Sequence, residues 1–204
     1  MIKNILITGV GGQGLLTLGK IIGSALMKAD YNVRIAETHG LSQRGGSVLV
    51  HVKFSDDEYI SPTISPGYGD IEISLELIEA VRNLYMLKED AIIVSNDLIL
   101  PPPAAKNVLS KELLLNELFH FNNVHIISAS EKALELGNIS VTNIIMLGYI
   151  VNQGILPVKK DIVVESIKEN IREKFWDINL KAFEIGYKLE SYKKGLNKNC
   201  EKFG

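Results

Sequence analysis

The chain has 204 residues, and its 22 Lys and Arg residues against 24 Asp and Glu residues give a formal net charge of -2. A hydrophobic fraction of 46% favours a globular protein over a disordered one. The balanced charge argues against non-specific nucleic-acid binding, which needs a basic surface. No apolar run reaches the roughly 18 residues of a membrane span, and no signal peptide pattern opens the sequence, so we expect a cytoplasmic protein away from the membrane.

Cysteine and histidine content limits the metal chemistry. The single cysteine, Cys200, cannot form a disulfide within the chain, a four-cysteine iron–sulfur cluster or a Cys-x-x-Cys zinc site. The four histidines lack the His-Glu-x-x-His spacing of zinc enzymes. We therefore expect no metal to be bound by this chain, and a free thiol in a reducing compartment.

The first part of the sequence predicts a strand–helix–strand opening. An apolar run over residues 2–8 predicts a buried strand, apolar residues at helical spacing follow from Leu15, and residues 32–36 predict a second strand. The polar, glycine-rich stretch 37–46 then leads into an alternating strand over 47–54. A long loop that joins two strands without a helix departs from simple Rossmann winding and suggests a function.

Later segments continue the alternation of strands and helices. We expect strands over 71–75, 91–95 and 124–128, helices over 76–87, 111–121 and 131–136, and a buried apolar helix over 141–151. Amphipathic helices capped by Asp161 and Asp177 should follow. The whole pattern predicts one Rossmann-like α/β domain over residues 1–192, with a mostly parallel sheet, flanking helices and a C-terminal helical extension. Residues 193–204 form a lysine-rich tail.

A glycine loop between the first strand and the first helix is the clearest ligand-binding motif. Gly9, Gly11 and Gly14 fit the pattern G-x-G-x-x-G, with Gly12 and Gln13 completing the loop. Glycines let backbone N–H groups approach a phosphate, and the helix N-terminus favours negative charge. Glu37, at the end of the second strand, could bind a ribose hydroxyl. The alternative is that the glycines serve only a tight turn and close helix packing.

A second group of candidate residues lies in the polar stretch that follows. The Arg44 side chain offers a planar fork for a carboxylate or phosphate, and Gly45 with Gly46 could form a backbone nest for an anion. His39 could act as a base or hydrogen-bond donor, with Ser42 and Gln43 beside it. The alternative is a solvated loop. Asn143, inside the apolar helix, should be a hydrogen-bonded buried amide, since an unpaired one is costly.

These motifs together resemble a known family. The segments 9–14 and 37–48, with further matches at 136–138 and 142–148, resemble the gamma-domain family of the 2-oxoacid:ferredoxin oxidoreductases. Within that family they look most like the beta subunit of indolepyruvate ferredoxin oxidoreductase. The resemblance covers about residues 1–190 in matching order. It is far more specific than a glycine motif alone.

The resemblance implies a subunit of a thiamine-diphosphate, iron–sulfur enzyme. In that family an arylpyruvate is decarboxylated oxidatively, coenzyme A accepts the acyl group, and ferredoxin takes the electrons. Thiamine diphosphate, Mg and the 4Fe–4S clusters would belong to a large alpha subunit, which fits the single cysteine here. The chain itself would assist coenzyme A or substrate binding without a catalytic residue that we can assign, through these candidates: Gly9, Gly11, Gly12, Gln13, Gly14, His39, Ser42, Gln43, Arg44, Gly45, Gly46 and Asn143.

Three other interpretations stay open at this point. One is a gamma subunit of a pyruvate or 2-oxoisovalerate ferredoxin oxidoreductase. Another is a stand-alone NAD(P)-binding oxidoreductase, supported by the glycine loop with Glu37, although no substrate domain is evident. The third is a non-catalytic binding module. The sequence leaves open the preferred 2-oxoacid, the stoichiometry of the complex, and whether the 39–46 stretch serves binding or assembly.

Overall fold

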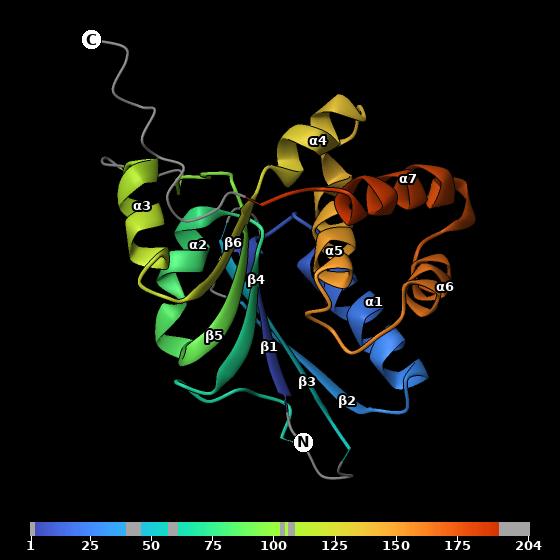
Figure 1. Ribbon diagram of the computed structural model, residues 1–204, viewed down its shortest axis with the longest axis horizontal. Coiled ribbons are helices and arrows are strands. Elements are labelled where there is room, and N and C mark those ends of the chain that lie inside the picture. The colour runs from blue at the N-terminus through green and yellow to red at the C-terminus, as the bar shows by residue number, and fades with distance from the viewer. Residues whose placement is uncertain (1–2, 40–45, 57–60, 103–104, 106–108, 192–204) are drawn as a thin grey trace.

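The computed structural model describes residues 3–39, 46–56, 61–102, 105 and 109–191. Its centre is a six-stranded sheet in the order β2-β3-β1-β4-β5-β6 (Figure 1). The strands are β1 (Lys3–Val10), β2 (Asn32–His39), β3 (Ser47–Ser55), β4 (Gly69–Ser74), β5 (Leu87–Asn96) and β6 (Asn123–Ile127). β1, β4, β5 and β6 pair in parallel, whereas β3 runs antiparallel to both β1 and β2. The expected mostly parallel α/β sheet is thus confirmed.

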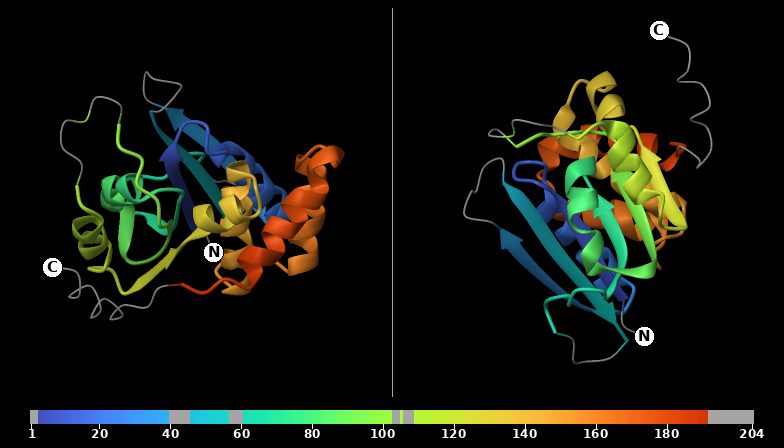
Figure 2. Two further views of the ribbon diagram at one scale, coloured as in Figure 1. Left: turned by 90° about the horizontal axis from the view of Figure 1, so that it is seen from above. Right: turned by 90° about the vertical axis from the view of Figure 1, so that its left-hand side faces the viewer.

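Helices cover both faces of this sheet, as the views in Figures 1 and 2 show. One face carries α1 (Leu15–Lys28), α5 (Thr142–Asn152), α6 (Lys160–Asn170) and α7 (Trp176–Tyr187), with α4 (Ala129–Glu135) beside α5. The other carries α2 (Leu77–Arg82) and α3 (Lys111–Leu118). Short 3-10 turns are η1 (Leu84–Met86), η2 (Ile139–Val141) and η3 (Glu173–Phe175). The C-terminal helices α6 and α7 form the expected extension.

Alternation along the strands divides the core between the two faces. Ile5 and Ile7 of β1 belong to the hydrophobic cluster under α1 and α5, whereas Leu6 belongs to the cluster under α2 and α3. Helix α1 lies close to the sheet because two of its residues lack a side chain. A Cβ at Gly19 would lie 3.0 Å from Val50 Cγ1, and a Cβ at Gly23 would lie 2.7 Å from the Cδ1 atom of Ile35.

The expected apolar core helix is confirmed as α5, whose residues 142–151 are all buried. It packs against α7 so closely that the two backbones touch. A Cβ at Gly148 would lie 2.2 Å from the Phe183 carbonyl oxygen, and a Cβ at Gly186 would lie 1.9 Å from that of Ile145. No side chain fits at either position, so these two glycines set the distance between the helices.

Several boundaries differ from those the sequence predicts. β2 continues through His39, because Glu37 and His39 pair with Val50 and Val48 of β3. Both residues therefore belong to a strand and not to a loop, and the connection to β3 is shorter than expected.

Helix starts and stops also depart from the sequence-based expectation. The helix expected over 76–87 ends at Arg82 and gives way to η1 and then β5. Asp161 and Asp177 lie in the first turns of α6 and α7, not at their N-caps. The predicted cap at Ser110 is confirmed, since its Oγ accepts a hydrogen bond from Leu113 N at 3.3 Å.

Candidate functional site

A cleft of about 430 Å³ opens beside the glycine loop, where β1 ends and α1 begins. Gly12 and Gly14 have φ angles of 105° and 79°, in the left-handed region that favours glycine. Gly14 is also the N-cap of α1, whose first turn has no acidic residue and no side-chain cap from the described part of the chain. The positive end of the helix dipole therefore faces this cleft. Its lining residues are Gly11, Gly12, Gly14, Leu15, Leu16, Thr17, Glu37 and Val48.

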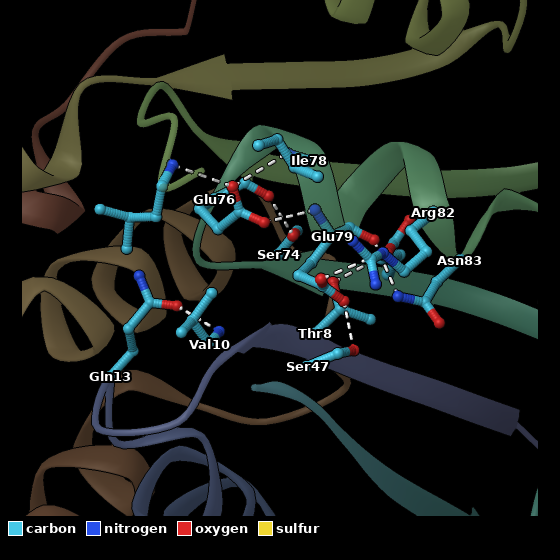
Figure 3. A network of polar contacts seen from close by, with 12 residues as sticks. Thr8, Val10, Gln13, Ser47, Ser74, Glu76, Ile78, Glu79, Arg82 and Asn83 are labelled. Atoms are coloured by element: carbon cyan, nitrogen blue, oxygen red, sulfur yellow. Dashed lines mark hydrogen bonds and ion pairs between the residues drawn. The ribbon is translucent and has the colours of Figure 1, made fainter. Parts of the chain in front are cut away.

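Gln13 holds the glycine loop in shape. Its Oε1 accepts a hydrogen bond from Val10 N at 2.7 Å, and its Nε2 donates to the Leu75 carbonyl oxygen at 3.2 Å. The first of these bonds is drawn in Figure 3. A Cβ at Gly9 would lie 2.6 Å from Gln13 Oε1, so Gly9 makes room for this bridge. Both residues build the loop, and the cleft lining comes from Gly11, Gly12 and Gly14 instead.

Asn143 of α5 forms a hydrogen bond to the same loop. Its Nδ2 donates to the Gly14 carbonyl oxygen at 3.1 Å, which confirms the expected hydrogen-bonded buried amide. Its Oδ1 is buried and has no hydrogen-bond partner among the described residues. A Cβ at Gly14 would lie 2.6 Å from Asn143 Nδ2, so the loop and α5 fit together only because position 14 is glycine.

The second sequence motif meets the first at Gly46. The Gly11 N–H donates to the Gly46 carbonyl oxygen at 3.0 Å, which ties the glycine loop to the residue before β3. Glu37 and Val48, on either side of the 39–46 stretch, both line the cleft. His39 is the last residue of β2, whereas Ser42, Gln43, Arg44 and Gly45 lie outside the described residues. The two motifs are therefore joined at one end of the cleft.

A buried acidic network lies on the other face of the sheet, beneath α2, and sequence analysis missed it. Glu72 and Glu76 are 0% exposed and Glu79 is 3% exposed. Glu76 caps α2 by accepting hydrogen bonds from the N–H groups of Ile78 at 3.0 Å and of Glu79, and its Oε2 also accepts from Leu100 N at 3.3 Å (Figure 3). The only signal in the sequence was a glutamate between two isoleucines at 71–73.

Glu72 and Glu79 lie in different polar surroundings. Burial raises the pKa of Glu72 well above its ordinary value, and the nearby Glu79 carboxylate raises it further, against the effect of a hydrogen bond from Thr8 Oγ1 at 2.8 Å. The Glu72 Oε2 atom has no partner among the described residues. Glu79 instead accepts a hydrogen bond from Ser47 Oγ and lies 3.2 Å from Arg82 Nε. Glu79 therefore links α2 to β3, whereas Glu72 bonds to Thr8 of β1.

Two histidines have structural partners. His51 Nδ1 accepts a hydrogen bond from Ile64 N at 3.3 Å, and His125 Nδ1 lies 2.7 Å from Tyr149 Oη. Burial lowers the pKa of both imidazoles, so both favour the neutral form. Across the described residues, no group of three or more His, Cys, Asp or Glu side chains could hold a metal ion. In the same part of the chain, no helix is long and apolar enough to cross a bilayer.

Comparison with known proteins places this architecture in a family. The family model described as pyruvate ferredoxin/flavodoxin oxidoreductase matches residues 4–189. The chain belongs to this family. This match confirms the resemblance seen in the glycine loop and in residues 37–48. The family is a subunit of 2-oxoacid:ferredoxin oxidoreductases, so this chain is a subunit of an oxidoreductase.

Relatives in the pyruvate ferredoxin/flavodoxin oxidoreductase family differ in how similar they are. The indolepyruvate oxidoreductase subunit IorB of Pyrococcus horikoshii is 37% identical over 191 residues, which cover 91% of this chain and 94% of that protein. The pyruvate/ketoisovalerate oxidoreductases common subunit gamma of Thermococcus kodakarensis is 28% identical over 182 residues, which cover 88% and 92%.

A solved structure shows the same fold inside a longer chain. The 2-oxoglutarate:ferredoxin oxidoreductase of Magnetococcus marinus, with 2-oxoglutarate, coenzyme A and succinyl-CoA bound, superposes with a TM-score of 0.71 at 18% identity. The match covers 91% of this chain but only 30% of that one. This family fold thus occurs both as a separate subunit-length chain and as one part of a larger protein.

Proposed function

We propose that this chain is the small (beta) subunit of an indolepyruvate:ferredoxin oxidoreductase. Such an enzyme converts arylpyruvates and coenzyme A to aryl-acetyl-CoA by oxidative decarboxylation, and passes the electrons to ferredoxin. The observation that carries the proposal is the 37% identity to an indolepyruvate oxidoreductase subunit over nearly the full length of both proteins. The 28% identity to a pyruvate/ketoisovalerate subunit makes that substrate class the second candidate.

In this proposal the large alpha subunit holds thiamine diphosphate, Mg and the 4Fe–4S clusters, which supply the decarboxylation and the electron transfer. The lone Cys200 of this chain cannot supply the four thiolates of a cluster. The chain contributes binding and assembly, and the partner contributes the redox chemistry.

The cleft beside the glycine loop is the proposed coenzyme A contact. Glycines at positions 12 and 14 leave the backbone open, and the uncapped first turn of α1 presents N–H groups to an anion. A phosphate of coenzyme A suits these donors. The sequence motif suggests further contacts to an anionic group, from Arg44 and from Gly45 and Gly46.

The strand order argues against a stand-alone NAD(P) enzyme. In dinucleotide-binding folds, the acidic residue that binds the ribose lies on the strand next to β1. Here the antiparallel β3 occupies that place and moves Glu37 one strand farther away. Glu37 still lines the cleft, but the ligand geometry differs from that of a Rossmann dinucleotide site.

Co-expression with a large thiamine-diphosphate protein encoded beside it tests the proposal. We expect a stable complex on size exclusion that reduces ferredoxin with indolepyruvate and coenzyme A, faster than with pyruvate or 2-oxoisovalerate. A chain that stays monomeric beside the large subunit would contradict the family role. A complex that prefers pyruvate would establish the second candidate instead.

Variants at Arg44 distinguish a role in ligand binding from a role in docking to the large subunit. If Arg44 holds an anionic group of coenzyme A or substrate, Arg44→Ala should weaken that ligand by about 1.5–3 kcal/mol, the scale of a charge-assisted hydrogen bond. Arg44→Lys should recover only part, because a point charge does not reproduce a planar fork. If the 39–46 stretch only docks the large subunit, the same variant loosens the complex but leaves the KM for coenzyme A unchanged.

A further inference from the structure

One wall of the cleft is held from the opposite face of the sheet. Val48 lines the cleft, and its two preceding residues each make a contact that fixes the start of β3. The Gly46 carbonyl oxygen accepts the hydrogen bond from Gly11 N at 3.0 Å. The Ser47 Oγ donates to Glu79 Oε2, beneath α2, as Figure 3 shows. Three consecutive residues thus connect the glycine loop, the cleft and the buried acidic network.

Glu79 is well suited to hold this position. Its side chain is buried, and its Oε1 forms an ion pair with Arg82 Nε at 3.2 Å. Its backbone is fixed as well, because Glu79 N donates to the Glu76 carboxylate and Asn83 Nδ2 donates to the Glu79 carbonyl oxygen at 2.8 Å. A charged acceptor on a fixed backbone makes a stronger and more directional bond to Ser47 than a neutral one.

We propose that Glu79 is a positioning residue for the cleft: its carboxylate fixes Ser47, and through Ser47 the hydrogen bond from Gly11 to Gly46 that shapes the glycine loop. Glu79 does not touch the cleft itself, since the lining comes from the loop, from α1, and from Glu37 and Val48. The part of this inference that concerns coenzyme A as the ligand of the cleft rests on the proposed function. The part that concerns the geometry of the glycine loop does not depend on it.

Ser47→Ala removes the donor, and Glu79→Ala removes the acceptor. Glu79→Gln keeps an oxygen for Ser47 but cannot form the ion pair with Arg82. A matched control is Ser166→Ala, which deletes another buried hydroxyl, bonded to the Ile162 carbonyl oxygen at 2.9 Å on α6, away from the cleft. Hydrogen exchange of the Gly11 amide, resolved by NMR on the full chain, reports the loop directly. Calorimetry with coenzyme A on the assembled complex reports the ligand.

We expect Ser47→Ala and Glu79→Ala each to speed Gly11 exchange about tenfold, the scale of one lost hydrogen bond, with Glu79→Gln between them and the wild type. The Ser47→Ala/Glu79→Gln double variant should be no worse than Ser47→Ala, because both changes act on one contact. Coenzyme A should bind several-fold more weakly to the same variants. Ser166→Ala should leave both measurements at the wild-type values.

The inference is overturned if the Gly11 amide of Ser47→Ala exchanges at the wild-type rate. Because Ser47→Ala removes only the hydroxyl oxygen, this test remains valid even if Glu79→Ala does not fold. Equal acceleration in Ser166→Ala also overturns it, because the effect would then be general loss of stability. If Gly11 exchange responds but the wild-type complex binds no coenzyme A, the proposed ligand fails while the positioning role of Glu79 stands.

Discussion

The two faces of the sheet are stabilised in different ways. Under α5 and α7 the buried side chains are predominantly apolar, and the helix backbones touch at Gly148 and Gly186. Under α2 the buried Glu76 holds the helix start and the loop at Leu100, and the buried Glu79 holds the start of β3. Apolar packing contributes stability without fixing any single contact, whereas a buried carboxylate costs desolvation and fixes its partners in return. Each region contacts residues around the cleft: Asn143 of α5 bonds to Gly14, and Glu79 of α2 bonds to Ser47.

The largest expected effect is on the apolar side. Gly186→Ala would place a Cβ 1.9 Å from the Ile145 carbonyl oxygen, so α5 and α7 must move apart. We expect the free energy of unfolding to fall by about 3 kcal/mol, the upper range for overpacking a core. Urea denaturation measures it. Lys181→Ala, an exposed change on the same helix, is the control and should stay within about 0.5 kcal/mol of the wild type. If Gly186→Ala leaves the free energy of unfolding unchanged, α5 and α7 can move apart at no energetic cost.

Asn143 and Gly14 connect the apolar side to the cleft and should be energetically coupled. Gly14→Ala puts a Cβ 2.6 Å from Asn143 Nδ2 at a φ of 79°, so both a clash and backbone strain oppose it. We expect a loss of about 2 kcal/mol in the wild-type background and about 1 kcal/mol in Asn143→Ala, where only strain remains. A double-mutant cycle by chemical denaturation measures the coupling. Strict additivity would mean that α5 does not support the loop.

The effect that is smallest in acid, and the most pH-dependent, concerns Glu72. Its pKa in the folded chain is raised by burial, so the folded state keeps a proton that the unfolded state releases. The stability linked to Glu72 is therefore present below the unfolded pKa and is lost as pH rises towards the folded pKa, at about 1.4 kcal/mol per pH unit.

Glu72→Gln removes this loss, because the amide is neutral at every pH and its Oε1 can still accept the hydrogen bond from Thr8. We expect the variant to match the wild type in acid and to exceed it in stability increasingly as the pH rises. Urea midpoints across a pH series measure the difference. If the urea midpoints of the two proteins change with pH in the same way, Glu72 is not protonated in the folded state. The buried polar groups under α2 would then differ less from the apolar packing under α5 and α7.

Local features of the fold could be predicted from the sequence because they depend on neighbouring residues. The apolar run at 141–151 predicted the core helix, and the apolar spacing from Leu15 predicted the first helix. The spacing of Gly19 and Gly23, four residues apart, puts both on the face of α1 that lies against the sheet. Each of these depends on periodicity or on the conformation of a single residue.

Contacts between distant segments could not be predicted in this way. Nothing in the order of segments shows that β3 inserts between β1 and β2, or that β1 pairs with β4 and so brings Thr8 to Glu72. The bond from Ser47 to Glu79 spans 32 positions, and that from Asn143 to Gly14 spans 129. Such pairs depend on the strand order and helix packing, which a single sequence specifies only through the complete fold.

Insertion of β3 also has a consequence for synthesis on the ribosome. The strands β1, β2 and β3, with α1 against them, all lie within the first 55 residues, and β3 pairs with both of its neighbours. This three-stranded unit is complete before β4, which ends at Ser74, has been made. At about 5–20 residues per second, the free edge of β1 waits roughly 1–4 seconds for its second partner. During that interval the nascent chain presents an unpaired apolar strand, so we expect chaperone protection to matter at this stage of its synthesis.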